Sequence, residues 1–174
     1  MLNASTRAKS SGMSLIELII GVAIMAIVMG LAAPSFFEWA RSIQIKNAAE
    51  SVTSGLQRAR AEAVARNTNV IFVLGAADTS WTVSVVAPAA VIETRSGSEG
   101  SQDTTRTVLP AGATALTFNN YGIAVANADA SPQLAQVDLA AVGTTRNMRV
   151  TIGVGGNAKM CDPSLAAGSS PRAC

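Results

Sequence analysis

An uncharged apolar run near the start of the chain limits what this sequence can fold into. Between Met13 and Phe37 the only ionisable side chain is Glu17. Because a helix rises about 1.5 Å per residue, roughly 20 to 25 residues cross a hydrocarbon core of about 30 Å. We therefore predict that residues 13–37 form the membrane-spanning half of a helix.

Two basic side chains, Arg7 and Lys9, precede this run. Positive residues that flank a first span are retained in the cytoplasm. We therefore predict a single-pass membrane protein, with its N-terminus in the cytoplasm and its C-terminal domain on the other side of the membrane.

Two candidate processing sites flank the apolar run. A secretory signal is cut after its apolar core, at small residues such as Ala32-Ala33, but the next residue, Pro34, disfavours that cut. The other candidate is the bond between Gly12 and Met13, before the core. In that case residues 1–12 are a leader that is removed.

Residues 12–18, after a short basic leader, resemble the type IV prepilin class, which includes the pseudopilins of type II secretion. The resemblance implies that a dedicated membrane peptidase cuts after Gly12 and methylates the new amino terminus at Met13. This class most often has Phe where Met13 stands. A proline at the place of Pro34 is common in the class, and its missing N–H predicts a helix kink there.

The position of Glu17 within the predicted span is also unusual on physical grounds. A carboxylate within a span costs about 2.5 to 3.5 kcal/mol on insertion scales, so it calls for a partner. The resemblance implies that Glu17 pairs with the free amine of a neighbouring subunit and sets the register as subunits stack into a filament. The alternative is a plain anchor whose acid reaches the headgroups, carrying a periplasmic binding domain unrelated to filaments.

Residues 38–66 change to an amphipathic helical pattern. Their apolar residues recur every three or four positions and predict one buried stripe, formed by Ile45, Ala48, Ala49, Val52, Leu56, Ala59 and Ala63. Residues 56–64 resemble the helix end of the H-type pseudopilin (GspH) and FimT or FimU-like minor pilin family. We predict an α+β fold in which this half of the helix packs on a mostly antiparallel β-sheet domain of residues 67–174.

The β domain is predicted from short β-rich runs separated by turn residues. The expected strands are 70–74, 81–86, 91–94, 107–109, 115–118, 123–125, 134–139 and 148–154. Residues 96–105 have no apolar side chain and are expected to form an exposed loop. In residues 118–122 we expect a turn in which Asn or Gly accepts a positive φ and Phe118 anchors the core.

The two cysteines, Cys161 and Cys174, lie close to the end of the sequence. In an oxidising compartment such a pair is expected to form a disulfide that closes a C-terminal loop. Pro163, Gly168 and Pro171 within that loop favour an irregular path that turns back on itself.

Composition excludes several functions. The formal charge is +2, and without the leader cations the chain has 11 basic and 11 acidic side chains, so a broadly basic nucleic-acid-binding body is not expected. The absence of histidine removes His-based triads and most zinc sites. The glycine-rich residues 153–156 lack the helix signal and Lys-Ser or Lys-Thr pair of a phosphate loop, and are interpreted as a strand end. We predict no enzyme, no cofactor and no bound metal.

DNA binding is the alternative function. Some FimT-like minor pilins bind incoming DNA through a Gly-Arg-x-Arg element before the first cysteine, and residues 156–159 match it with Asn and Lys in place of the two arginines. Phosphate binding needs clustered cations, so only a weak contact is expected. The candidates for it are Lys159, Arg172, Arg146 and Arg149. Surface charge that aids solubility is the favoured interpretation.

Taken together, these motifs identify the chain as a member of the minor pilin and pseudopilin class. The resemblance implies a place in or near the tip of a type IV pilus or a type II secretion pseudopilus, where the subunit helps to initiate assembly. The implied partners are other minor and major pilins or pseudopilins, the prepilin peptidase and the inner-membrane assembly platform. The C-terminal disulfide loop favours a pilus subunit.

Overall fold

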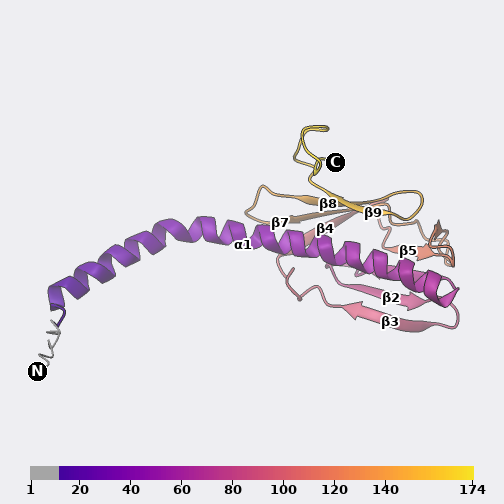
Figure 1. The fold of residues 1–174 in the computed structure, drawn as a ribbon, viewed down its shortest axis with the longest axis horizontal. Coiled ribbons are helices and arrows are strands. Elements are labelled where there is room, and N and C mark those ends of the chain that lie inside the picture. The colour runs from indigo at the N-terminus through magenta and orange to yellow at the C-terminus, as the bar shows by residue number, and fades with distance from the viewer. Residues whose placement is uncertain (1–11) are drawn as a thin grey trace, which may run out of the picture. The chain divides into compact units, whose positions relative to one another are not determined.

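The computed structural model describes residues 12–174, so the leader cations Arg7 and Lys9 lie outside the described residues. The chain divides into two units, Met1–Phe37 and Glu38–Cys174. Within residues 12–174 the chain forms one helix, α1 (Leu15–Arg66), followed by nine strands (Figure 1). The helix begins in the first unit and ends in the second, and the strands all belong to the second.

The part of α1 that lies in the second unit is amphipathic. The predicted stripe is confirmed, because every one of its members is buried: Ile45, Ala48, Ala49, Val52, Leu56, Ala59 and Ala63. Ser51 and Gly55 are buried on the same helix. Figure 1 shows this part of α1 running along the strands of both sheets.

Five strands form the first sheet, in the order β3-β2-β1-β5-β6, and all neighbours in it are antiparallel. Their bounds are β1 Val70–Leu74, β2 Trp81–Val85, β3 Ala90–Arg95, β5 Ala115–Phe118 and β6 Ala124–Val125. The second sheet has the order β4-β7-β8-β9, again antiparallel. Its strands are β4 Thr104–Leu109, β7 Gln136–Ala141, β8 Met148–Ile152 and β9 Ala158–Cys161. The predicted α+β fold is confirmed.

Each sheet buries one of its faces. Buried and half-buried residues alternate along β1, β2 and β7, as expected for strands that are covered on one side only. Phe72 of the first sheet and Val137 of the second join the stripe of α1 in one hydrophobic cluster. The opposite face of the second sheet is left for polar side chains.

The helix packs closely on the first sheet at Gly55. A Cβ atom at Gly55 would lie 2.7 Å from Cε2 of Phe72 and 2.9 Å from Cδ2 of Trp81. The centroids of these two rings are 5.9 Å apart, and Nε1 of Trp81 donates a hydrogen bond to Oγ of Ser51 at 2.9 Å. Because neither ring has free space to move, this position requires a residue without a Cβ.

The predicted turn between β5 and β6 is present. Phe118 is fully buried, and Gly122 has a φ of 70°. The side-chain oxygen of Asn119 accepts hydrogen bonds from the N–H groups of Tyr121 and Ile123, both at 3.0 Å. Asparagine thus closes the turn, and glycine supplies the left-handed conformation.

One prediction for the β region is wrong, and one strand was not predicted. The stretch 96–105 is not simply an exposed loop, because Ser101 and Thr104 are buried and β4 begins at Thr104. The Ser101 hydroxyl tolerates burial because it is hydrogen-bonded to Thr79 Oγ1 at 2.7 Å and to the carbonyl of Gly97 at 2.8 Å. Strand β9 was not predicted; it pairs with β8, and its Ala158 and Met160 pack against the hydrophobic cluster.

Candidate assembly site and C-terminal end

The residues predicted for processing and assembly lie at the start of α1. Gly12 and Met13 precede the helix, and Met13 is 71% exposed. The carbonyl of Ser14 accepts a helical hydrogen bond from the N–H of Leu18 at 3.1 Å, which puts Ser14 at the N-cap position. Glu17 is exposed in the first turn, where the helix dipole favours a negative charge. A new amine at Met13 would therefore start about one turn before Glu17.

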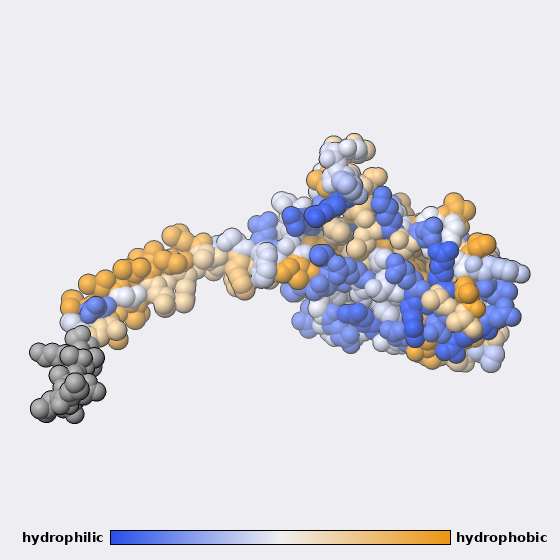
Figure 2. Space-filling view, viewed as in Figure 1, coloured by the Kyte–Doolittle hydropathy of each residue, from blue (hydrophilic) through white to orange (hydrophobic). Residues whose placement is uncertain are grey.

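The helix that follows this turn is apolar on all sides. From Leu15 to Trp39 every large apolar side chain is at least 53% exposed, and Figure 2 shows a nearly unbroken apolar surface along it. Within residues 12–174, α1 alone is long and apolar enough to cross a membrane. Such a surface is stable in lipid or against other apolar helices, and not in water.

Pro34 lies inside α1, and the helix continues through it. Nearby, Oγ of Ser35 donates a hydrogen bond to the carbonyl of Ala32 at 2.9 Å. The rings of Phe36 and Phe37 are 6.2 Å apart in an edge-to-face arrangement. The predicted kink at Pro34 stays a prediction.

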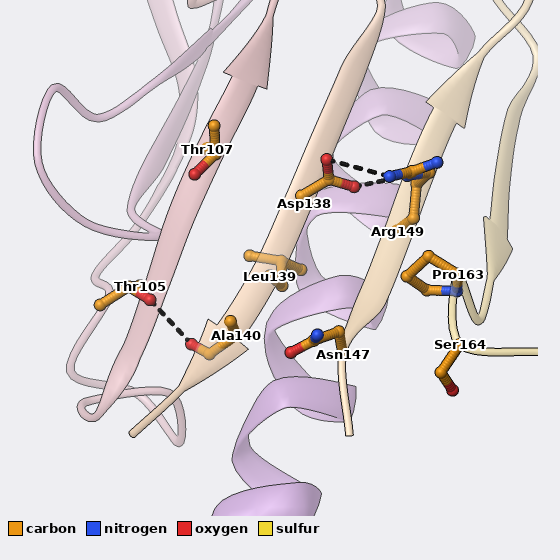
Figure 3. Close-up of a pocket in the computed structure, with 9 residues that line it drawn as sticks. All are labelled: Thr105, Thr107, Asp138, Leu139, Ala140, Asn147, Arg149, Pro163 and Ser164. Atoms are coloured by element: carbon orange, nitrogen blue, oxygen red, sulfur yellow. Dashed lines mark hydrogen bonds and ion pairs between the residues drawn. The ribbon is translucent and has the colours of Figure 1, made fainter. Parts of the chain in front are cut away.

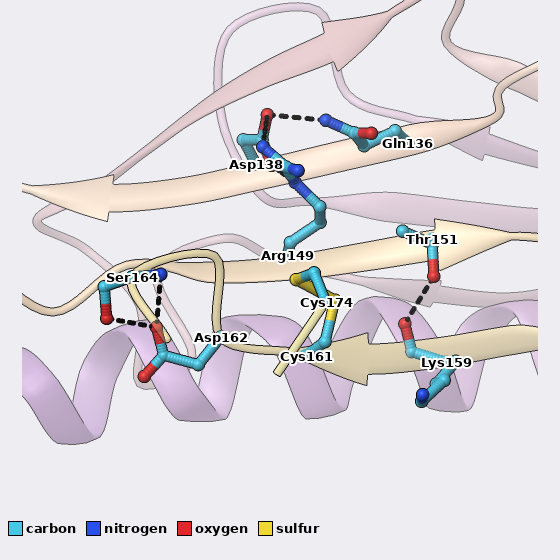
Figure 4. The surroundings of a disulfide bond; sticks show 9 residues. All are labelled: Gln136, Asp138, Arg149, Thr151, Lys159, Cys161, Asp162, Ser164 and Cys174. Carbon is cyan, nitrogen blue, oxygen red and sulfur yellow. Dashed lines mark hydrogen bonds and ion pairs between the residues drawn. A yellow bond between two sulfur atoms is a disulfide. The ribbon is translucent and has the colours of Figure 1, made fainter. Parts of the chain in front are cut away.

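The predicted C-terminal disulfide is present. Cys161 and Cys174 are bonded, with Cα atoms 5.0 Å apart (Figure 4). The N–H of Asp162 donates to the carbonyl of Arg172 at 2.6 Å, so the two ends of the loop lie side by side. Oδ1 of Asp162 also accepts the N–H and the hydroxyl of Ser164, at 2.9 and 2.5 Å. The loop is irregular along its whole length, as predicted.

The four candidate DNA-contacting cations do not form one free cluster. Arg149 donates from Nε to Oδ1 of Asp138 at 2.5 Å and from Nη2 to Oδ2 at 3.3 Å. Figure 4 shows the Arg149 guanidinium turned to Asp138, while the side chain of Lys159 extends away from it. Lys159, Arg146 and Arg172 are exposed. The DNA contact stays a prediction, and Asp138 already neutralises one of its four members.

Two acidic side chains of the second unit, Glu62 and Asp78, accept hydrogen bonds that shift their pKa. Among residues 12–174, no three His, Cys, Asp or Glu side chains lie together as metal ligands. A hydrogen bond from Arg66 holds the pKa of Glu62 below its ordinary value. Hydrogen bonds from Ser80 do the same to the pKa of Asp78. Both carboxyls are therefore ionised at neutral pH and accept hydrogen bonds from their neighbours.

Sequence reasoning missed a hollow of about 320 Å³ on the second sheet. Figure 3 shows it on the face of β4, β7 and β8 that is turned away from α1, beside the pair of Asp138 and Arg149. Pro163, from the disulfide loop, lies at its edge. Polar residues at alternate positions of β4 and β7 were a signal in the sequence. The register that brings four chain segments together is not visible in the sequence.

Known proteins are similar to this chain in both sequence and fold. The sequence profile of the family described as type II transport protein GspH matches residues 48–156, and that of the prokaryotic N-terminal methylation motif matches residues 7–33. One crystal structure of the type IV minor pilin FimU from Pseudomonas aeruginosa is 20% identical, with a TM-score of 0.53, over 72% of this chain and 93% of that chain. A second crystal structure of FimU from the same organism is 21% identical, with a TM-score of 0.54, over 71% of this chain and 98% of that chain. No curated protein matches the chain.

Proposed function

The chain belongs to the family of the type II transport protein GspH, and from this premise we propose that it is a minor pilin or pseudopilin with a place in or near the filament tip. There it helps to initiate the assembly of a type IV pilus or a type II secretion pseudopilus. The observation that carries the proposal is a methylation motif over residues 7–33 that opens directly into an exposed apolar helix with Glu17 in its first turn.

The proposed sequence of events begins in the inner membrane. The leader stays in the cytoplasm, residues 13–37 span the bilayer, and the β domain folds in the periplasm. The prepilin peptidase cuts between Gly12 and Met13, which frees an amine that is then methylated. The assembly platform next lifts the subunit into the filament, where neighbouring apolar helices replace lipid around α1.

Glu17 sets the register of this step in the proposal. In the filament core its carboxylate pairs with the amine of a neighbouring subunit's first residue. Removing one partner from a buried ion pair costs about 3 to 5 kcal/mol, because the remaining charge is left without a counter-charge in an apolar setting. A loss of that size lowers the occupancy of the filament at least about 100-fold.

The experiment compares Glu17→Gln with Glu38→Gln, which changes an exposed acid later in the same helix. Both variants are expressed in cells that lack the wild-type chain, and the sheared filament fraction is probed for the subunit. We expect both to be cut and to enter the membrane, and only Glu17→Gln to be missing from the sheared filament fraction. Equal recovery of the two variants in this fraction would contradict the role of Glu17.

Deletion of the gene distinguishes the two kinds of filament. If the chain is a pilus subunit, deletion should abolish twitching or DNA uptake. If it is a pseudopilus subunit, deletion should leave secreted enzymes in the periplasm. We favour the pilus, because the cysteine-closed C-terminal end resembles minor pilins.

A further inference from the structure

The hollow on the outer face of the second sheet carries an inference that goes beyond filament assembly. We propose that it is a binding site for one neutral hexose unit of a glycan. Its volume of about 320 Å³ lies at the lower end of the range for ligand pockets. The proposal rests on the register, the charge balance and the free hydrogen-bonding groups of this face.

Strand register places the key side chains in one row. Thr107 of β4 lies opposite Asp138 of β7, and Asp138 lies opposite Arg149 of β8. Residues directly opposite one another in antiparallel strands project from the same face of the sheet. The neighbouring positions Val137 and Leu139 are fully buried, so the row faces away from the core.

The charges in this row cancel each other. Arg149 is joined to Asp138 by two hydrogen bonds, and Gln136 donates a third to Asp138 Oδ2 at 2.8 Å. The side chains of Asp138 and Arg149 are 30% and 31% exposed. An anion would meet the carboxylate and a cation would meet the guanidinium. The site therefore favours a ligand without net charge.

The remaining polar groups suit hydroxyls. In Figure 3 the dashed lines join Thr105 to Ala140 and Arg149 to Asp138. The hydroxyl of Thr107 and the side-chain amide of Asn147 form no hydrogen bond within residues 12–174. A threonine hydroxyl and an asparagine amide each offer both a donor and an acceptor. Thr107 and Asn147 stand two strands and two residues apart in the register. Sugar hydroxyls have the same double capacity, so hydroxyls at opposite ends of one pyranose can satisfy these two groups.

The disulfide loop supplies an apolar wall. Pro163 is half-buried at the rim of the hollow, and Figure 3 shows its ring between Arg149 and Asn147. The Cys161–Cys174 bond holds the base of this loop against β9. A proline ring is a suitable surface for the C–H face of a pyranose, which binds by apolar contact.

An extended peptide is a less suitable occupant. Peptides that add to a sheet use the unpaired main-chain groups of an edge strand. The hollow lies on the face of β4, β7 and β8, of which only β4 is an edge strand. Main-chain groups point along the plane of a sheet, and those of β7 and β8 are paired on both sides, so a ligand on this face meets side chains.

Saturation-transfer NMR on the full-length chain tests the proposal. The protein is kept in a polyoxyethylene detergent, because the common maltoside detergents carry a sugar themselves. The probes are the methyl α-pyranosides of glucose, galactose and mannose at about 10 mM, which largely fills a site with a Kd near 1 mM. We expect saturation transfer to at least one of the three.

Variants locate the binding and test the charge argument. Thr107→Val and Asn147→Ala should each weaken the signal at least fivefold, whereas Thr82→Val, on β2 of the other sheet, should leave it unchanged. Asp138→Asn leaves Arg149 without its counter-charge, so this variant should prefer glucuronate to the neutral sugars. Unfolding curves of each variant confirm that the domain is intact.

Three results would overturn the proposal. The first is no transfer to any of the three sugars from a folded protein. The second is a saturation-transfer signal that is as strong in Thr107→Val and Asn147→Ala as in the control Thr82→Val. The third is stronger binding of inorganic phosphate or of a Ser/Thr-rich peptide than of any neutral sugar at the same concentration.

Discussion

Replacing Gly55 with alanine tests how tightly α1 packs on the first sheet. The added Cβ would lie 2.7 Å from Phe72 and 2.9 Å from Trp81, whereas carbon atoms pack best at about 3.5 to 4.0 Å. Overpacking of this kind costs about 1 to 3 kcal/mol, and alanine returns up to about 1 kcal/mol of helix propensity. Phe72 and Trp81 are both buried, so we expect a cost in the upper part of this range, about 2 to 3 kcal/mol, and a net loss of about 1 to 2 kcal/mol in the free energy of unfolding.

Thermal unfolding of the full-length chain in detergent, followed by near-ultraviolet circular dichroism, measures this loss. For a domain of this size we expect Tm to fall by roughly 3 to 8 °C. The matched control is Gly21→Ala in the same helix, since nothing lies within 4 Å of a Cβ at that position. A Gly55→Ala protein as stable as wild type would refute the close helix–sheet packing described above.

The remaining predictions concern stability, pH and DNA. The double variant Cys161→Ser and Cys174→Ser should lose about 3 kcal/mol in urea unfolding, because an open loop raises the entropy of the unfolded chain; an unchanged midpoint would contradict this. The pKa of Glu62 is lowered from its ordinary value of 4.5 by the hydrogen bond from Arg66. The contribution of the Glu62 carboxylate to the free energy of unfolding is therefore complete above pH 4.5 and is lost as the pH falls through the folded pKa. The wild-type protein should therefore lose more stability than Glu62→Gln between neutral pH and pH about 3. Parallel curves of unfolding free energy against pH for the two proteins would show that the pair of Glu62 and Arg66 contributes nothing to stability. Because Arg149 is already paired, duplex DNA should not be retarded in a gel at about 0.15 M salt; a shift that Lys159→Ala abolishes would contradict this.

The sequence predicts the parts of this fold that obey local rules. The buried stripe from Ile45 to Ala63 follows the helical period, and the turn at Gly122 follows from the conformations that glycine and asparagine accept. The disulfide follows from two cysteines in an exported domain. The stripe and the turn depend on residues that are close together in the sequence. The disulfide depends on the compartment, which the N-terminal apolar run indicates.

Features that depend on long-range pairing could not be predicted. Strand β9 (Ala158–Cys161) has no β-branched residue, and β8 imposes its extended form by main-chain pairing. Burial of Ser101 depends on Thr79, a hydrogen-bond partner from a distant loop. The hollow exists because the register sets Thr107, Asp138 and Arg149 side by side. Sheet order and register are tertiary properties, so no local pattern specifies them.

Intact mass and N-terminal sequencing of the protein from membranes test the central claim most directly. The chain is expressed with and without the prepilin peptidase, and the two samples are compared. The account predicts a chain that starts at N-methylated Met13 when the peptidase is present and an uncut chain when it is absent. A chain that keeps residues 1–12 in the presence of an active peptidase would contradict the claim that this protein is a filament subunit.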